Sequence, residues 1–203
     1  MSRGGGRPPV LVLVLAAAFL LLVASLVIGA LTKPEYPPYH LSPAAAAARA
    51  GPAGGSLVGP ALYTLDASST TDWRPFAFAR QSTVPPTGTW DLAFRRFHVI
   101  AAPGAGLQDL GTVPFDSVAA VPEHGYLDNV ADPDTTNPGV GKWYRYSMLS
   151  HLLTSKHHVY AVRTAAGRYA KLELLAYYCA DVGVACVTFR YVYQSDGSRR
   201  VAK

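Results

Sequence analysis

The sequence predicts a mainly β domain that follows a single N-terminal transmembrane helix. Two observations support this fold class. An uncharged segment covers residues 8–32, and after residue 60 short runs of Trp, Tyr, Phe and Val alternate with clusters of Gly, Pro, Asp and Ser. About 170 residues follow the apolar segment, enough for one core of ordinary size. We therefore expect four parts: a cytoplasmic tail (1–7), the transmembrane helix (8–32), a linker (33–60) and an extracytoplasmic β domain (61–203).

The apolar part of the first segment, Val10 to Leu31, is about as long as the roughly 20 residues that a membrane-spanning helix needs. Arg3 and Arg7 precede it, and such charges favour the cytoplasmic side. A cleaved secretory signal is the alternative, although its apolar core is usually only about 7 to 15 residues long. We expect an uncleaved signal anchor in the bacterial cytoplasmic (inner) membrane, with the C-terminal domain on the periplasmic side. Under either interpretation residues 33–203 are exported.

Residues 33–60 are rich in Pro, Ala and Gly, a composition typical of a spacer. Ser42 followed by Pro43 is a favourable helix start, and Gly51 is a favourable helix stop. The sequence therefore predicts one short helix inside this linker.

The rest of the exported part contains seven segments of strand composition and one of helical spacing. The predicted helix runs from Ser147 to Lys156, because four apolar residues recur there at i, i+1, i+4 and i+5. The predicted strands are Ala61–Leu65, Trp73–Ala79, Trp90–Ile100, Lys142–Ser147, His158–Thr164, Arg168–Tyr178 and Val187–Gln194.

The segment Arg168–Tyr178 shows the clearest alternation. Small and apolar side chains fall on one face, whereas Lys171 and Glu173 fall on the other. This alternation predicts a strand with one buried face. Gly167, just before the strand, can supply the positive φ that a tight hairpin turn favours.

Cys179 and Cys186 are the only cysteines, and six residues separate them. They lie in a part of the chain that faces an oxidising compartment, where thiols pair. A metal site would need more ligands than this neighbourhood offers. We predict a disulfide that closes the neck of the hairpin formed by the last two strands.

The charge of the chain argues against a nucleic-acid partner. The formal net charge is +5, and when Arg3 and Arg7 are set aside, 16 basic and 13 acidic side chains remain in the exported part. This excess is small and evenly spread. The sequence also contains neither a Gly-x-Ser-x-Gly motif nor the Lys-Ser/Thr ending of a phosphate-binding loop. We predict a protein that is not an enzyme and has no catalytic residue.

Metal sites are not predicted either. Asp128, Asp132, Asp134 and Asn137 place several oxygen atoms in one loop, but their spacing is not that of an EF-hand, and we interpret the loop as a solvated turn. The six histidines form no zinc motif. Two histidines that the fold brings together could instead ligate a haem iron from opposite sides.

Five segments together carry a resemblance to a known family. They are Trp90–Arg96, Gly141–Tyr146, His158–Thr164, Arg168–Leu172 and Val187–Gln194. In this order they resemble the HmuY family of haem-binding, mostly β, exported bacterial proteins, across roughly residues 62 to 194. The resemblance implies a HmuY-like antiparallel β domain with Trp90, Phe94, Trp143, Tyr146 and Phe189 in its core. It also implies haem as the cofactor.

The first hypothesis for function is therefore a haem-binding or haem-handling module on the outer face of the cytoplasmic membrane. We predict His124 as one axial ligand and His151, His157 or His158 as the opposing one, with His98 in reserve. Tyr126, Tyr144 and Tyr160 would line the cleft.

The second hypothesis is an accessory subunit of a membrane-protein complex, such as a respiratory or photosynthetic electron-transfer assembly. Its helix would pack among other helices through small residues such as Ala24 and Gly29, while the β domain caps the complex. The haem hypothesis requires two iron-reaching side chains that face one cleft. The subunit hypothesis requires neither.

Overall fold

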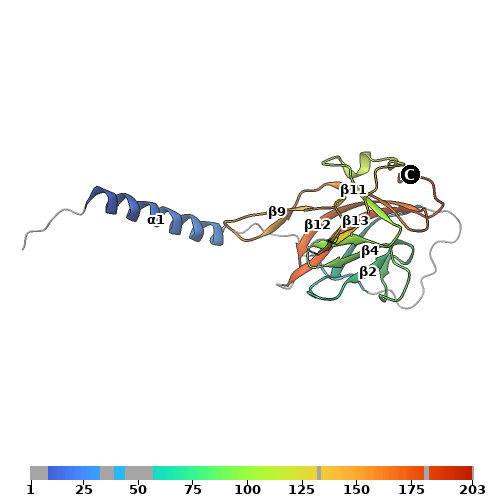
Figure 1. Cartoon of the computed structure of the whole chain (residues 1–203), viewed down its shortest axis with the longest axis horizontal. Helices are drawn as coiled ribbons and strands as arrows, with labels where there is room; N and C mark the ends of the chain where they lie inside the picture. Colours follow the sequence, from blue (N-terminus) through green and yellow to red (C-terminus); the bar gives the residue numbers. More distant parts are fainter. Residues whose placement is uncertain (1–8, 33–38, 44–56, 132–133, 181–182, 203) are drawn as a thin grey trace, which may run out of the picture. The chain divides into compact units, whose positions relative to one another are not determined.

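The computed structural model (Figure 1) describes residues 9–32, 39–43, 57–131, 134–180 and 183–202. The chain divides into two compact units. One contains the N-terminal helix together with residues 146–153, and the other contains the rest of the β domain.

The helix α1 spans Val10–Leu31 and has a mean hydropathy of 3.2. Its end is closed at Thr32, whose backbone N–H and hydroxyl both donate to the Ile28 carbonyl at 2.8 Å. By length and composition α1 can cross a membrane, although a signal sequence would pass the same test. The predicted apolar helix is thus confirmed, whereas its retention as an anchor stays a prediction.

The β domain is built from two antiparallel sheets, some of whose strands are labelled in Figure 1. The five-stranded sheet has the order β1 (Leu57–Asp66), β13 (Val184–Gln194), β12 (Tyr169–Tyr178), β11 (Val159–Arg163) and β6 (Gly106–Asp109). The four-stranded sheet has the order β3 (Ser82–Thr83), β2 (Arg74–Ala77), β4 (Leu92–Arg95) and β5 (His98–Ala101). Two short pairs are β7 (Val130–Ala131) with β8 (Thr135–Thr136), and β9 (Tyr144–Tyr146) with β10 (Leu153–Ser155). The mainly β prediction is confirmed.

The inner core lies between these two sheets and is aromatic. Phe189 on β13 contacts Phe76 on β2, with ring centroids 5.1 Å apart, and stacks on Phe94 of β4 at 5.2 Å. Tyr63 and Tyr191 extend this cluster from β1 and β13. Phe94, Phe189 and Trp143 are buried as predicted, but Trp90 is only partly buried and Tyr146 is 48% exposed.

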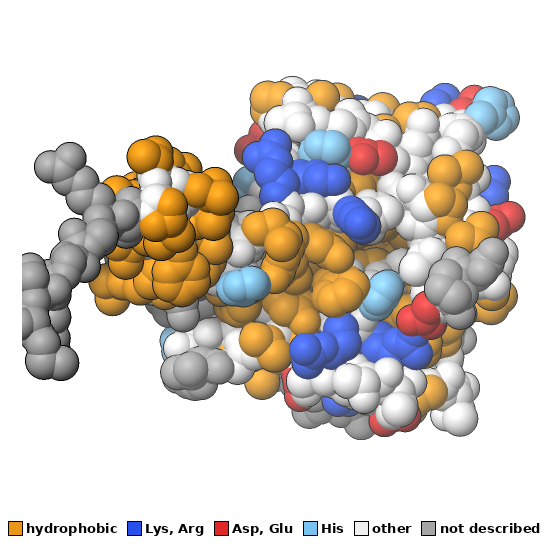
Figure 2. Space-filling view, turned by 60° about the vertical axis from the view of Figure 1, so that its left-hand side comes forward, with side chains coloured by type: hydrophobic (Ala, Val, Ile, Leu, Met, Phe, Trp, Pro, Cys, Tyr) orange, Lys and Arg blue, Asp and Glu red, His pale blue; other side chains and the backbone are white. Residues whose placement is uncertain are grey.

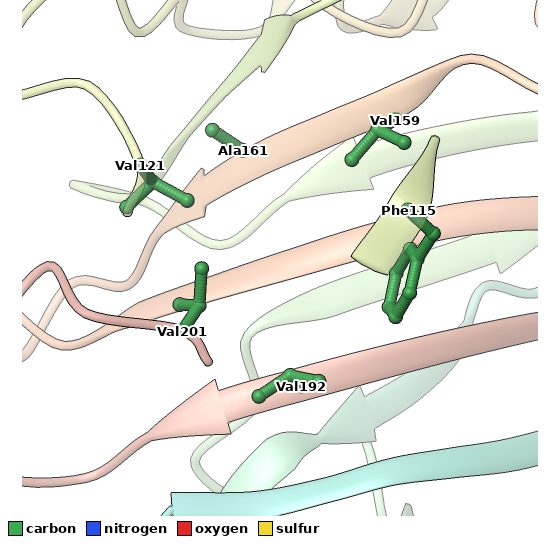
Figure 3. Packing of buried hydrophobic residues seen from close by; sticks show 6 residues of the cluster. All are labelled: Phe115, Val121, Val159, Ala161, Val192 and Val201. Carbon is green, nitrogen blue, oxygen red and sulfur yellow. The ribbon is translucent and has the colours of Figure 1, made fainter. Parts of the chain in front are cut away.

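The outer face of the five-stranded sheet is buried as well, which the alternation of Arg168–Tyr178 did not predict. A second cluster of apolar residues packs there (Figure 3). Val159, Ala161 and Val192 come from β11 and β13, and the covering chain adds Phe115, Val121 and Val201. Lys171 and Glu173 are therefore only 2% and 4% exposed. The prediction of a single buried face was wrong because a segment without strands covers the polar side.

The predicted helix over residues 147–156 is also wrong. Residues 147–152 instead form the turn of a hairpin whose strands are β9 and β10. The backbone N–H of Lys156 donates to the Trp143 carbonyl at 3.0 Å, which pairs the hairpin stem. Met148 and Leu149 share no buried helical face; they are exposed at the turn.

Two strand predictions need smaller corrections. The segment Trp90–Ile100 is divided into β4 and β5 by a tight turn at Arg96, whose φ is +53°. Strand β1 begins at Leu57, inside the predicted linker. Most of the predicted linker helix lies outside the described residues, but Ser42 pairs with Thr64 of β1 through its backbone N–H and its hydroxyl, at 2.9 Å each.

The predicted disulfide is confirmed. Cys179 follows β12 and Cys186 lies in β13, with their Cα atoms 5.0 Å apart. The bond closes one end of the β12–β13 hairpin. Gly167 has the positive φ of +69° expected for the turn before β12.

Candidate functional site

The most site-like group of side chains surrounds Phe97, in the turn between β4 and β5. The centroid of its ring lies 4.5 Å from that of His98, 5.2 Å from that of Tyr144 and 6.3 Å from that of Tyr177. We call these four residues the Phe97 cluster. Tyr177 is buried, whereas the other three are partly exposed. Such a surface offers apolar faces to a flat ligand.

Local backbone geometry explains why Phe97 stands in this position. Arg95 pairs with His98 across a two-residue turn, and the left-handed Arg96 donates its N–H to the Ala67 carbonyl at 2.7 Å. The buried Trp143 donates its indole N–H to the Phe97 carbonyl at 2.8 Å. Both contacts hold the turn, so that the aromatic ring is presented on a rigid support.

His98 is the member of the cluster that can bind a metal. Burial lowers the pKa of His98; Arg95 acts in the same direction, and Asp134 opposes it. The imidazole is therefore neutral at physiological pH, the form that ligates iron. Among the described residues, no hydrogen bond engages its ring nitrogens.

Two arginines flank the cluster, and only one is available to a ligand. The Nη2 of Arg95 donates to both carboxylate oxygens of Asp134, at 2.5 and 2.6 Å, and the Arg95 guanidinium lies 4.4 Å from the centroid of the Trp73 ring. Within the part of the chain that the structure describes, the Arg96 guanidinium makes a single, long contact of 3.4 Å, with the Ser68 carbonyl. Burial raises the pKa of Tyr177, and the positive charge of Arg96 partly offsets this increase. The Arg96 charge therefore acts on a member of the Phe97 cluster.

His157 and His158 are adjacent in sequence but turn to different partners. The Nδ1 of His157 lies 2.9 Å from Glu173 on β12, and the Nδ1 of His158 lies 2.8 Å from Asp109 on β6. These two strands flank β11 on opposite sides. A carboxylate on Nδ1 leaves Nε2 free and is typical of metal-ligating histidines. Each is therefore a ligand-like histidine, but the two do not face each other.

The other two predicted ligands, like His157, are exposed. His124 lies in a loop with its side chain 89% exposed, and its Nε2 is 3.7 Å from Glu123. His151 is in the hairpin turn, where its Nδ1 lies 2.6 Å from the Tyr146 hydroxyl. The structure thus places the four predicted ligands in four separate environments, and their role in haem binding stays a prediction.

Of the three tyrosines predicted to line the cleft, only Tyr144 belongs to the Phe97 cluster. Tyr160 is a residue of β11 and is only 1% exposed. Tyr126 donates its hydroxyl to the Pro122 carbonyl at 2.7 Å, and Arg163 lies 5.5 Å over its ring.

A hollow of about 440 Å³ lies elsewhere on the β domain. Trp73, Pro75 and Pro85 supply its apolar lining, and Asp66, Asp72 and Arg74 supply its charges. Its size is within the usual range for small-molecule sites, but no histidine lines it. It therefore offers no imidazole ligand to a haem iron.

The loop with several oxygen ligands is used for structure. Asp134 pairs with Arg95, and the 1%-exposed Asn137 donates to the Leu127 carbonyl and accepts from the Gly139 N–H. Our interpretation as a solvated turn fails for Asn137, which is buried. Within the described residues, no three His, Cys, Asp or Glu side chains form a group that could hold a metal ion.

The sequence prediction missed the centre of the cluster, because Phe97 was placed inside one long strand. Neither Arg96 nor Phe97 is a residue type that usually marks a turn. The only available signal was length, since the predicted strand of 90–100 is about twice the usual five to six residues.

On the face shown in Figure 2, hydrophobic side chains gather in an exposed patch, with histidine and basic side chains at its edge.

Comparison with known proteins supplies the family context. The sequence model of the HmuY protein family matches residues 69–191. No curated protein matches the chain significantly.

Solved structures share the fold at low sequence identity. A protein from Bacteroides vulgatus, proposed to be HmuY-like and haem-binding, is 20% identical with a TM-score of 0.56, over 66% of this chain and 92% of its own. The apo HmuY analogue of Tannerella forsythia is 16% identical with a TM-score of 0.52, over 70% and 98%. A Bacteroides fragilis protein proposed to be a lipoprotein is 19% identical with a TM-score of 0.53, over 66% and 91%.

Proposed function

Because the chain belongs to the HmuY family, we propose that it is an exported, non-enzymatic binding domain that holds haem at the Phe97 cluster. The observation that carries this proposal is the half-buried position of His98 among aromatic side chains, where burial lowers the pKa of its ring. The related structure proposed to bind haem supports the choice of ligand class.

The residues of the cluster divide the task of binding a flat, anionic ligand. Phe97 and Tyr144 offer partly exposed rings that can stack on a porphyrin. Arg96 offers a positive charge for a carboxylate group of the ligand. His98 would hold the iron through a ring nitrogen, and a single axial histidine is sufficient in some haem proteins. Bound haem would supply the iron.

We further propose that α1 is retained, so that the domain stays on the outer face of the cytoplasmic membrane. The support is the length and uniform apolar character of α1, and the arginines at positions 3 and 7. In this arrangement the tail (1–7) would lie in the cytoplasm and the helix (8–32) in the membrane. The linker (33–60) and the β domain (61–203) would lie on the periplasmic side. A tethered domain receives or presents its ligand rather than diffusing to collect it.

The test is an absorption titration of the full-length, detergent-solubilised chain with hemin. We expect a Soret band that saturates at one haem per chain, and about tenfold or greater loss of affinity in His98→Ala, because the iron loses its ligand. His40→Ala, which removes an exposed histidine outside the cluster, is the matched control. A featureless titration of the wild-type chain would overturn the proposal.

The same titration decides among the histidines predicted from sequence. His124→Ala, His151→Ala, His157→Ala and His158→Ala should each leave the band in place if His98 is the sole ligand. A low-spin spectrum that one of these variants converts to high spin would identify a second axial ligand. Loss of the band in one of them, with His98→Ala unchanged, would move the site away from the Phe97 cluster.

The accessory-subunit function remains the second candidate, because α1 has no buried residue in the described structure and is apolar on every side. Its small residues allow close approach of another helix, and the Ser25 hydroxyl is already satisfied by the Leu22 carbonyl at 2.7 Å. Stoichiometric co-purification with an electron-transfer complex in mild detergent, together with a featureless hemin titration, would favour this function.

A further inference from the structure

The hairpin between β9 and β10 ends in exposed apolar side chains. We call residues 146–153 the hairpin tip. Met148 is 72% exposed, Leu149 is 53% exposed and Tyr146 is 48% exposed. The tip is ordered by its own backbone, since the Ser147 N–H donates to the Leu152 carbonyl at 2.9 Å and the His151 N–H donates to the Ser147 carbonyl at 2.8 Å. A formed turn therefore displays two large apolar side chains side by side.

The hairpin tip packs against the end of α1, and both belong to the same compact unit. A Cβ atom added at Gly29 would lie 3.1 Å from the Leu149 Cβ and 3.2 Å from its carbonyl oxygen. Gly29 is in the last turn of α1, just before the helix ends at Leu31. The apolar surface of the tip is thus continuous with the apolar surface of the helix.

The charge of the hairpin is also one-sided. Lys142, Arg145 and Lys156 lie in its stem, and residues 142–158 include no Asp or Glu. Basic side chains beside a membrane segment are attracted to anionic lipid headgroups, and tyrosine is enriched at the membrane interface. The composition matches the boundary between headgroups and acyl chains better than it matches water.

From these observations we infer that the hairpin tip inserts into the interface of the bilayer that α1 crosses, with Met148 and Leu149 among the acyl chains and the basic stem at anionic headgroups. The inference rests on the proposed retention of α1 as an anchor. It is independent of haem binding. The tip would be a second lipid contact of the exported chain, beside the end of the helix.

The experiment places a reporter tryptophan in the full-length chain, reconstituted in two sets of vesicles whose lipids carry bromine on the acyl chains either near the headgroup or near the chain end. Three variants are compared after subtraction of the wild-type emission: Met148→Trp at the tip, Phe19→Trp inside α1, and Val130→Trp at an exposed site on β7. We expect the added emission of Met148→Trp to be quenched about twofold or more beyond that of Val130→Trp, because bromine quenches only at short range.

The outcomes separate the tip from the anchor. Quenching of Phe19→Trp without quenching of Met148→Trp would overturn the inference and leave the anchor intact. Absence of quenching in both would overturn the anchor and the inference together. The Met148→Trp emission would be blue-shifted, unquenched by lipid and dependent on protein concentration if a second copy covered the tip instead. That result would also overturn the inference.

A charge variant tests the role of the basic stem. Arg145→Glu in the Met148→Trp background should reduce the quenching in vesicles that contain phosphatidylglycerol and have little effect in pure phosphatidylcholine. Arg80→Glu, which reverses an exposed charge elsewhere on the domain, is the control. Equal quenching in both lipids for all variants would exclude attraction to anionic lipid.

Discussion

The two faces of the five-stranded sheet are both buried, but they are buried in different ways. The inner face packs against a second sheet, and its contacts are between aromatic rings such as Phe76, Phe94 and Phe189. The outer face is covered by irregular chain around Phe115. Hydrogen bonds from the charged Lys171 side chain hold part of that cover on the sheet. A regular partner thus permits an apolar interface, whereas an irregular partner brings backbone carbonyls that need hydrogen-bond donors.

Lys171 provides those donors on the outer face. Its Nζ donates to the carbonyls of Phe115 and Val118, both at 2.9 Å, and lies 4.6 Å over the Phe115 ring. Burial lowers the pKa of Lys171, and nearby Asp116 opposes this effect. Lys171 thus links β12 to the covering segment through buried hydrogen bonds.

Glu173, two residues further along β12, is the second buried charged residue of this strand. It accepts a hydrogen bond from Arg190 of β13 at 2.6 Å and contacts His157 at 2.9 Å. Glu173 is therefore paired with the positively charged Arg190 and Lys171 is hydrogen-bonded to two carbonyls, so both buried groups have polar partners. Their side of the strand is polar in sequence and still inaccessible to water.

The largest expected effect is at the centre of the inner core. Phe76→Ala removes a fully buried ring that contacts Tyr63, Phe78, Phe189 and Tyr191, and it should lower the free energy of unfolding by about 3–5 kcal/mol. Phe115→Ala on the outer face should cost less, because water can enter beside the covering segment. The urea midpoints of the full-length chain in detergent measure both, and equal losses would contradict the difference between the faces.

A second prediction concerns Asp91, the charge at the border of the inner core. Its carboxylate accepts the Phe78 N–H at 2.8 Å, but burial outweighs this bond and raises the pKa of Asp91 to about 6. The unfolded chain binds this proton with a pKa near 3.8. The folded protein therefore holds the proton more tightly, and stability from this group is present below pH 3.8 and falls as the pH rises through 6.

Asp91→Asn keeps an acceptor for Phe78 and cannot ionise. It should raise the free energy of unfolding above pH 6 by up to about 3 kcal/mol and flatten its pH dependence between 4 and 7. Urea unfolding at several pH values checks this, with Asp128→Asn, an exposed carboxylate, as the control. A variant whose pH dependence matches that of the wild type would show that Asp91 is not held protonated.

The smallest effect is expected on the outer face. Lys171→Met keeps the bulk of the side chain but leaves the Phe115 and Val118 carbonyls without their donor, a loss of about 1–3 kcal/mol. Amide hydrogen exchange of residues 113–121 should accelerate, while exchange in the inner strands should change little. Lys142→Met, which alters an exposed lysine, is the control. Unchanged exchange in the covering segment would mean that Lys171 does not hold it.

The inner core was largely predictable because its residues lie on regular strands. The alternation in Arg168–Tyr178 and the strand composition of Val187–Gln194 identified β12 and β13, and the two cysteines in an exported segment identified the disulfide. The outer core was not predictable, since its cover comes from chain far away in sequence. Lys171 and Glu173 would stand at the same alternating positions of the sequence if their face of the strand met water. The pattern therefore does not reveal that a covering segment buries them.

The candidate site was less predictable than the fold. Tyr144 and His98 were recognised as candidates, but Phe97 was hidden inside a predicted strand, and Tyr177 was predicted only as part of the strand Arg168–Tyr178. The hairpin of residues 144–155 was mistaken for a helix, because apolar residues four apart fit a helical face as well as a turn followed by a strand.

The sequence by itself determined the apolar helix, the mainly β domain, its family and its disulfide. These features depend on local composition, on the two-residue period of strands and on an ordered set of motifs. Only the tertiary structure decided which charges are buried, that His98 joins Phe97, Tyr144 and Tyr177, and that the hairpin tip exposes Met148 beside α1. Each of these depends on contacts between distant segments, and a single sequence does not encode such contacts in any local pattern.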